Sequence, residues 1–377
     1  MAERQYTTLV DALQDVPDPR KRRGQRYPWP LLLTLVATAV VSGQAHGRAI
    51  SQWVHEHVDE LEPVLATAPG RVPSEATLRR VMQTVAVVAL DACLSAVRPA
   101  GEPATTPGGL IGVAMDGKEV RGVRAHGRIV HLLGLVRHDG IVLAQMAVAQ
   151  KTNEIKAAPV LLRSHNLRGH VVTVDALLTQ RGLARQIRRQ GGHYLMAVKD
   201  NQPELLAAST TLFTDPPWLV EERAREVWQA GTVEKGHGRL ETRTLMASTT
   251  LNDYLDWPGL GQVLQRTCRR VLLASGEVTE DTSYALTSLR PDQASAATLA
   301  TLWRGHWTIE NRVHHVRDVS FREDATRAYV GHTAHAFASL HNAAVNLFRL
   351  VGWTRIADAL RHFGAHVHRA LTLVGAG

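Results

Sequence analysis

The chain has 377 residues, of which 45% are hydrophobic, so it is long enough for two or three domains with sizeable cores. Its formal net charge of +8 favours a polyanionic partner. Two cysteines are too few for a zinc finger or a disulfide framework and indicate a reducing cytoplasm. The longest apolar run, residues 31–41, is shorter than the roughly 18–20 residues that span a bilayer, so we expect no membrane partner.

Residues 1–98 are predicted to form a helical domain. The apolar run is expected to be a buried helix, and Ser74 is placed to cap a second helix that carries Arg79 and Arg80. These arginines are candidate contacts to a groove of DNA, although most paired charges simply lie on a solvated helix face. Residues 99–109 are rich in proline and glycine and are expected to be a linker.

Two apolar runs after this linker each end in an aspartate. Residues 110–115 precede Asp116 and residues 171–174 precede Asp175, so each carboxylate is expected at the carboxyl end of a buried strand. A single aspartate at a strand end is more often a turn or capping residue. The occurrence of two, with a third acid downstream, is what suggests a shared site.

The segments around these runs predict a mixed α/β domain. Residues 128–136 and 141–149 flank Asp139-Gly140, a strong turn signal, and are expected to form an antiparallel hairpin beside the Asp116 strand. The elements that follow are expected to alternate between helix and strand: a helix over residues 154–164, a helix from Thr179 and a strand over residues 194–198.

Several polar side chains come directly after predicted strands, on the edge of the sheet where the two aspartates are expected. Ligands of open α/β sheets usually bind at this edge. The candidate DNA contacts there are Lys118, Arg121, Lys199, Asn201 and Gln202.

Residues 225–286 contain several alternating segments and predict a β-rich insertion. Arg239 follows Gly238, which permits close backbone approach, so Arg239 is a candidate phosphate contact, with Glu241 and Arg243 on the same face of a strand. The tryptophans in or near this segment are expected to pack in the core rather than stack on a DNA base: Trp218, Trp228 and Trp257.

Residues 299–318 are predicted to form an amphipathic helix that carries a polar stripe. Steps of three, four and seven residues place on one side of it Trp303, His306, Glu310 and Arg317. Trp303 is a candidate DNA contact, and Arg317 is a candidate phosphate contact. His306 is equally consistent with a pH-dependent DNA contact and with a structural histidine bonded to a backbone carbonyl.

Asp116, Asp175 and Glu310 together suggest a divalent-metal site. Carboxylates within a few ångströms repel one another unless a cation compensates, and Mg²⁺ or Mn²⁺ prefers such oxygen ligands. Two ions about 3.5–4 Å apart can promote phosphodiester cleavage or transfer. The pair His314-His315 has no third ligand at metal spacing, so we expect these histidines on the helix surface rather than in a zinc site. The chain has no phosphate loop or dinucleotide-binding motif, so we expect no nucleotide cofactor.

Six groups of short motifs follow one another along the chain: Ala114-Met115-Asp116-Gly117-Lys118 with Arg121-Gly122; Lys151-Thr152-Asn153-Glu154-Ile155; Val174-Asp175-Ala176 with Thr179-Gln180; residues 194–199 with Asn201-Gln202-Pro203; His237-Gly238-Arg239 with Glu241 and Arg243; and His306-Trp307-Thr308-Ile309-Glu310-Asn311. Their order and spacing resemble those of DDE-type insertion-sequence transposases, and within them the H-repeat-associated branch. The similarity covers nearly the whole chain.

The resemblance implies an α/β protein with a ribonuclease-H-like catalytic core over residues 110–350, in which the Asp116 and Asp175 strands lie side by side, and a β-rich insertion at about residues 213–290. The N-terminal helical domain would hold transposon ends, and residues 351–377 would be a helical tail. Asp116, Asp175 and Glu310 would bind two Mg²⁺ or Mn²⁺ ions. The wider superfamily differs along the stripe, where it shows Tyr, Arg, Glu and Lys in place of Trp303, His306, Glu310 and Arg317.

The function implied is cleavage of transposon ends and their joining to target DNA, in the bacterial cytoplasm and at the nucleoid when DNA is bound. Because two ends must be paired, the resemblance also implies at least a homodimer on DNA. Two alternatives stay open: a non-catalytic DNA-binding protein descended from a transposase, and a metal-dependent nuclease that cleaves without joining strands.

Overall fold

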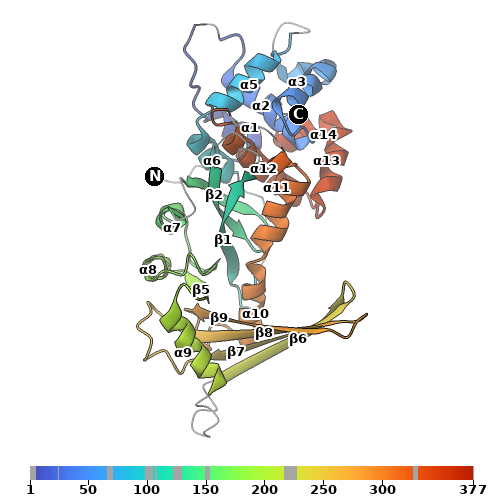
Figure 1. Cartoon of the computed structure of the whole chain (residues 1–377). Helices are drawn as coiled ribbons and strands as arrows, with labels where there is room; N and C mark the ends of the chain where they lie inside the picture. The colour runs from blue at the N-terminus through green and yellow to red at the C-terminus, as the bar shows by residue number, and fades with distance from the viewer. Residues whose placement is uncertain are drawn as a thin grey trace.

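The sheet that carries the two aspartates is continuous through the molecule. The computed structural model describes residues 6–23, 25–65, 71–97, 105–106, 108–121, 130–148, 153–215, 227–325 and 330–376. Within these ranges nine strands form one mixed sheet in the order β3-β2-β1-β4-β5-β9-β8-β7-β6 (Figure 1). The strands are β1 Ile111–Val120, β2 Val130–Arg137, β3 Val142–Val148, β4 His170–Val174, β5 His193–Val198, β6 Val227–Gly236, β7 Arg239–Ser248, β8 Gln262–Leu272 and β9 Val278–Thr287.

The strands that carry the aspartates are neighbours. β1 pairs in parallel with β4, with Met115 opposite Val174, which confirms the predicted adjacency. Asp175 follows the last residue of β4, as expected. The prediction that Asp116 ends its strand is wrong, because β1 continues to Val120 by antiparallel pairing with β2. The apolar run stops at Asp116, but alternate residues beyond it are still buried on one face.

The predicted hairpin beside β1 is confirmed. β2 and β3 pair antiparallel, and the Arg137 N–H donates to the Ile141 carbonyl at 2.8 Å across the turn. Gly140 has a φ of +96°, a left-handed conformation that glycine adopts without steric cost. The hairpin forms the edge of the sheet beyond the Asp116 strand.

The two faces of the sheet contact different helices, because successive strand residues point to opposite sides. Val113 and Met115 belong to a core with helices α7, α8 and α9, whereas Ala114 packs with Ile309 and Val313 near the carboxyl end of α10. These helices are α7 Glu154–Leu162, α8 Arg181–Arg189, α9 Pro203–Thr214 and α10 Ala296–Gly305. Asp116, two residues after Ala114, therefore lies on the face that α10 approaches.

The predicted β-rich segment extends the core sheet instead of forming a separate body. β9 pairs antiparallel with β5, and β8, β7 and β6 continue the sheet beyond it (Figure 1). Trp257 is buried in the core that includes α7, α8 and α9, and Trp228 packs against a second core that includes residues of β7, β8 and β9. Their predicted packing role is therefore confirmed. Trp218 lies outside the described residues, as do residues 149–152 and Gly122.

Helices from both ends of the chain share one core. The N-terminal helices are α1 Leu9–Gln14, α2 Trp29–Val41, α3 Gly47–Glu56, α4 Val58–Leu65, α5 Glu75–Thr84 and α6 Val87–Ser95, and the C-terminal ones are α12 Thr333–Leu350, α13 Ile356–Gly364 and α14 Val367–Val374. The two sets of helices lie together at one end of the molecule (Figure 1). Side chains of both sets belong to one buried cluster, with the apolar helix α2 at its centre. The predicted boundaries at residues 98 and 351 therefore do not separate independent cores, because α12 to α14 cover surface that the N-terminal helices expose. Most of the predicted linker lies outside the described residues.

The mixed α/β class with N-terminal helices is confirmed, and the strand order from β3 to β5 agrees with the ribonuclease-H-like core that the resemblance implied. Helix α2 is buried, as predicted, and Ser74 stands at the N-cap of α5. In the described ranges no helix has both the length and the apolar content needed to cross a bilayer.

Candidate active site

The helix predicted over residues 299–318 is interrupted where it meets the sheet. After α10 the chain forms a π-helical turn, Ile309–His314, and then the short helix α11, His315–Val319. A π-turn spans one residue more than an α-turn, and the His315 N–H accordingly donates to the Glu310 carbonyl. Trp303, His306 and Glu310 line one cavity, so the predicted stripe is kept over these three residues, whereas Arg317, which follows the π-turn, is buried against Glu323.

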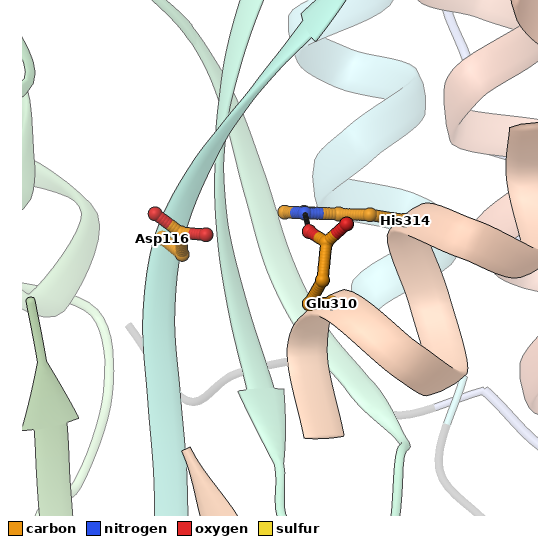
Figure 2. Close-up of side chains that lie close together, drawn as sticks. All are labelled: Asp116, Glu310 and His314. Carbon is orange, nitrogen blue, oxygen red and sulfur yellow. Dashed lines mark hydrogen bonds and ion pairs between the residues drawn. The ribbon is translucent and has the colours of Figure 1, made fainter. Parts of the chain in front are cut away.

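Asp116 of β1 converges with Glu310 and His314 of the π-turn (Figure 2). One ligand atom from each of the three lies within 4.8 Å of the others, and His314 Nδ1 is 3.0 Å from Glu310 Oε2. The predicted surface position of His314 is wrong, since it is only 5% exposed, whereas its neighbour His315 is exposed as expected. His314 is buried because the π-turn packs against the sheet through its neighbour Val313.

Asp175 lines the same cavity but is not part of this cluster. The cavity has a volume of about 860 Å³ and is bordered by Asp116, Asp175 and Glu310 among others. Asp175 Oδ1 accepts the Leu178 N–H at 3.0 Å, and the Thr179 hydroxyl donates to the Asp175 carbonyl at 2.9 Å. Asp175 thus stabilises the turn after β4 and also faces the cavity.

The electrostatics of the cavity favour a bound cation. Burial raises the pKa of Asp116 above its ordinary value, and the charge of Asp175 adds to this, although His314 and His306 oppose it. The hydrogen bond from His314 holds the pKa of Glu310 below its usual range. Carboxylates in this setting are the donor set that Mg²⁺ and Mn²⁺ prefer, so the residues present fit such an ion.

His306 is tied to the sheet through Thr173. The Thr173 Oγ1 lies 3.1 Å from His306 Nδ1 and 3.2 Å from His138 Nε2, and it donates to the Val113 carbonyl at 3.3 Å. A hydroxyl donates one hydrogen bond and accepts two, so both imidazoles donate to it. Burial lowers the pKa of His306, and that of His138 to about 4, so both rings are neutral near pH 7. Of the two roles considered for His306, this favours the structural one, with a hydroxyl acceptor in place of a carbonyl.

The ring of His138 is wedged between two glycines. A Cβ at Gly112 would lie 2.0 Å from His138 Nδ1, and one at Gly305 would lie 2.1 Å from it. Gly112→Ala is therefore expected to displace the ring and to lower the free energy of unfolding by roughly 1–3 kcal/mol, as overpacking of a filled core does. Urea denaturation measures the change.

The matched control for that substitution is Gly182→Ala. Gly182 lies in α8 with no atom near the position of a Cβ, so alanine should leave stability equal or raise it. If Gly112→Ala were as stable as the wild type, the close packing of the His138 ring against Gly112 would be contradicted.

Two predicted DNA contacts are buried and paired inside the protein. Lys118 is 7% exposed, with its Nζ 2.6 Å from both carboxylate oxygens of Asp318. Arg317 is 2% exposed and donates to Glu323 from Nε at 3.0 Å and from Nη2 at 2.6 Å. The prediction that they touch DNA is wrong for this conformation, because Lys118 lies on the covered face of β1 and Arg317, which follows the π-turn, is buried against Glu323.

Trp303 was also predicted to contact DNA and is 5% exposed. The Arg266 guanidinium lies 4.7 Å from the centre of its ring, a cation–π contact at the cavity wall. Burial of the ring contradicts a direct contact to DNA, and the ring instead supports this wall of the cavity.

The remaining predicted contacts are at least partly exposed. Lys199 is exposed and lines the cavity. Asn201 and Gln202 donate to the Ala176 carbonyl at 2.7 Å and the Thr179 carbonyl at 2.9 Å, so they brace the loop that follows Asp175. The others lie away from the carboxylate cavity and are exposed: Arg79 and Arg80 on α5, Arg121 at the end of β1, and Arg239 at the start of β7.

Residues 107–347 match the family model described as the transposase DDE domain, and residues 10–97 match the model described as DDE_Tnp_1-associated. The chain belongs to the transposase DDE domain family.

Relatives of this DDE-domain chain span most of its length. It is 29% identical over 351 residues to "Putative transposase YncI" of Escherichia coli O157:H7, which covers 91% of this chain and 87% of the relative. It is 27% identical over 350 residues to "H repeat-associated putative transposase YhhI" of Escherichia coli strain K12, with 90% and 89% covered. Among solved structures, the piggyBac transposase synaptic complex with hairpin DNA matches with a TM-score of 0.45 and 9% identity, over 98% of this chain and 77% of that one.

A groove lined by arginines adjoins the carboxylate cavity of the DDE domain. It has a volume of about 840 Å³ and shares Arg266, Asp281 and Trp307 with that cavity. Trp307 is 57% exposed. The arginines that line the groove are Arg239, Arg243, Arg266, Arg270, Arg304 and Arg312.

A buried acid organises part of this groove. Glu241 is 6% exposed, and its Oε1 lies 2.5 Å from Arg239 Nε and 3.7 Å from Arg270 Nε, while its Oε2 pairs with Arg243. One carboxylate therefore holds three guanidinium groups at the surface of the sheet.

Sequence reasoning missed most of the groove and the burial of His314. In β8, Arg266 and Arg270 stand four residues apart, an even step that places both on one face of a strand. This spacing could have predicted from the sequence that the two arginines share a face of the strand. For His314 the signal was its separation of four residues from Glu310, which places the two on one side of a helix.

Proposed function

We propose that the chain is a DNA transposase that cleaves transposon ends and joins them to target DNA. The observation that carries the proposal is that Asp116, Asp175 and Glu310 border one cavity adjoining an arginine-lined groove, in a chain of the transposase DDE domain family. The carboxylates supply a place for metal-assisted phosphoryl transfer, and the arginines supply a surface for the DNA backbone.

We assign Asp116, Asp175 and Glu310 as ligands of two Mg²⁺ or Mn²⁺ ions. Ions bound there would supply the Lewis acidity for attack by water or a 3′-hydroxyl and for departure of the leaving oxygen. The chain contributes orientation: β1 carries Asp116 on a rigid strand, the Leu178 N–H holds Asp175, and His314 holds Glu310. Such preorganisation lowers the barrier because the charged groups need not rearrange during the reaction.

The arginine groove supports DNA as the substrate. Its six arginines exceed the nearby acids, which are Glu234, Glu241 and Asp281. Arg270 is loosely held, at 3.7 Å from Glu241 and 3.5 Å from Asp281. A guanidinium so loosely paired can exchange its partner for a phosphate, which it binds with two hydrogen bonds.

Arg239→Ala and Arg270→Ala, each alone, are expected to weaken DNA binding and to reduce the slope of log affinity against log salt by about 1, because each phosphate contact releases about one counterion. Fluorescence anisotropy with labelled duplex from about 50 to 200 mM salt measures both quantities. Arg290→Ala is the control, since Arg290 is paired with Asp292 and lines neither cavity. An unchanged slope in both test variants would exclude the groove as the DNA surface.

The test of the function is an in vitro reaction of the wild-type protein with labelled end DNA of its element, a target plasmid and Mg²⁺ or Mn²⁺. Metal-dependent cleavage followed by joined products supports the transposase. Cleavage without joined products would indicate the nuclease, and binding without cleavage would indicate a non-catalytic DNA-binding protein.

A further inference from the structure

We infer that His314 is a nitrogen ligand of the ion bound by Asp116 and Glu310, and that this ligand makes the site bind Mn²⁺ in preference to Mg²⁺. The inference rests on the proposed function, because it concerns the same metal site. It adds a ligand to the three carboxylates and a chemical reason for the choice of metal.

The geometry of the cluster is close to that of a first coordination shell. At metal–ligand distances of about 2.0–2.1 Å, adjacent ligand atoms of an octahedral ion lie about 3 Å apart. His314 Nδ1 and Glu310 Oε2 are separated by 3.0 Å, and one atom from each of Asp116, Glu310 and His314 lies within 4.8 Å of the others (Figure 2). A closure of Asp116 toward the pair would complete the site, with the proton of the neutral imidazole on Nε2 so that Nδ1 offers its lone pair to the ion in place of the hydrogen bond to Glu310.

His314 lies in a π-turn that is packed against the sheet, although a π-turn is less stable than a regular α-helical turn. Val313, its neighbour, is 2% exposed and packs with Ala114 and Val136 of the sheet, which anchors the π-turn against β1 and β2. Such turns are found frequently at functional sites. Here the π-turn places His314, at 5% exposure, beside the carboxylates, while His315 stays at the surface.

The chemistry of imidazole explains the expected metal preference. Mg²⁺ is a hard ion that takes oxygen ligands and gives up water reluctantly. Transition-metal ions accept nitrogen ligands more readily, and neutral imidazole is the commonest of these in proteins. An imidazole beside two carboxylates therefore favours Mn²⁺ over Mg²⁺.

If His314 only donated a hydrogen bond to Glu310, its nitrogen would not contact the ion, and the electron spin-echo spectrum of bound Mn²⁺ would show no directly bound nitrogen. Electron spin-echo modulation of the Mn²⁺-loaded, full-length wild type is expected to show coupling to a directly bound ¹⁴N nucleus, and this measurement requires no substitution. His314→Gln should remove that coupling, and His315→Gln, the exposed neighbour, should retain it. Absence of the coupling in a wild type that binds Mn²⁺ would overturn the inference and leave the proposed function standing.

Affinity gives a second readout. Mn²⁺ titration followed by the signal of free Mn²⁺, with Mg²⁺ as competitor, is expected to show Mn²⁺ affinity lower in His314→Gln by about 100-fold or more, since loss of a residue that only hydrogen-bonds a ligand already costs about 10–100-fold. Mg²⁺ affinity should fall less, so the preference for Mn²⁺ shrinks. Equal losses for the two ions would contradict the inference, and failure of the wild type to bind either ion would overturn the proposed function with it.

Discussion

Asp116→Asn is expected to lower the rates of cleavage and joining of end DNA by about 10³-fold or more, while the affinity for DNA changes little. Stabilisation of transition-state charge by a bound metal ion amounts to several kcal/mol, and each 1.36 kcal/mol corresponds to a factor of ten in rate. Asparagine keeps the size of the side chain but loses the charge and one oxygen ligand. The arginine groove, which lies apart from β1, should still hold the DNA.

The measurement is a time course of cleaved and joined products under single-turnover conditions, with anisotropy on the same protein for affinity. Glu310→Gln should behave in the same way, and Asp253→Asn is the control, because Asp253 is exposed and lines neither cavity. Wild-type rates in Asp116→Asn would refute metal-dependent catalysis at this site. A parallel loss of DNA affinity would instead indicate that Asp116 supports the DNA surface.

Glu323→Gln is expected to lower the free energy of unfolding at pH 7 by about 3–5 kcal/mol, the usual result of leaving a buried charge without its partner. Glu323 is 4% exposed, accepts two hydrogen bonds from Arg317, and lies 2.9 Å from His341 Nδ1. The neutral amide would leave the Arg317 guanidinium uncompensated inside the protein. Asp292→Asn, in an exposed ion pair, should leave stability unchanged.

The same cluster makes the wild type sensitive to acid. Burial alone would raise the pKa of Glu323, but the charge of Arg317 and the hydrogen bond of His341 outweigh it, so this pKa lies well below its usual range. Burial lowers the pKa of His341. For both groups the unfolded state binds protons at higher pH than the folded state, so stability is lost as the pH falls, below about 6.5 for His341 and below about 4.5 for Glu323.

Thermal unfolding between pH 8 and 4 measures this dependence. Glu323→Gln should show a shallower loss at the acid end, because its side chain no longer binds a proton. Equal slopes for the wild type and the variant below pH 4.5 would show that Glu323 does not govern acid stability.

The local pattern of the chain determined the central strands and the β2–β3 hairpin, whereas the pairing of β1 with β4 was implied by the family resemblance. Apolar runs identified β1, β4 and β5 because strands in the middle of a sheet are buried on both faces, and Asp139-Gly140 identified the β2–β3 turn. The motifs around Asp116, Asp175 and Glu310 indicated the family, which the match over residues 107–347 establishes.

Tertiary structure alone decided which polar side chains reach the cavity. Helical spacing places Glu310 and His314 on one side of a helix, but only the packing of the π-turn Ile309–His314 against the sheet shows that His314 is buried and that Arg317 pairs with Glu323. Lys118 follows Asp116 on the same face of β1, yet Asp318, 200 residues later in the chain, pairs with it. Likewise, the N-terminal helices and α12 to α14 form one core because surfaces distant in sequence cover each other. Periodicity reports local geometry and local burial, whereas contacts between distant segments depend on the packing of the whole chain.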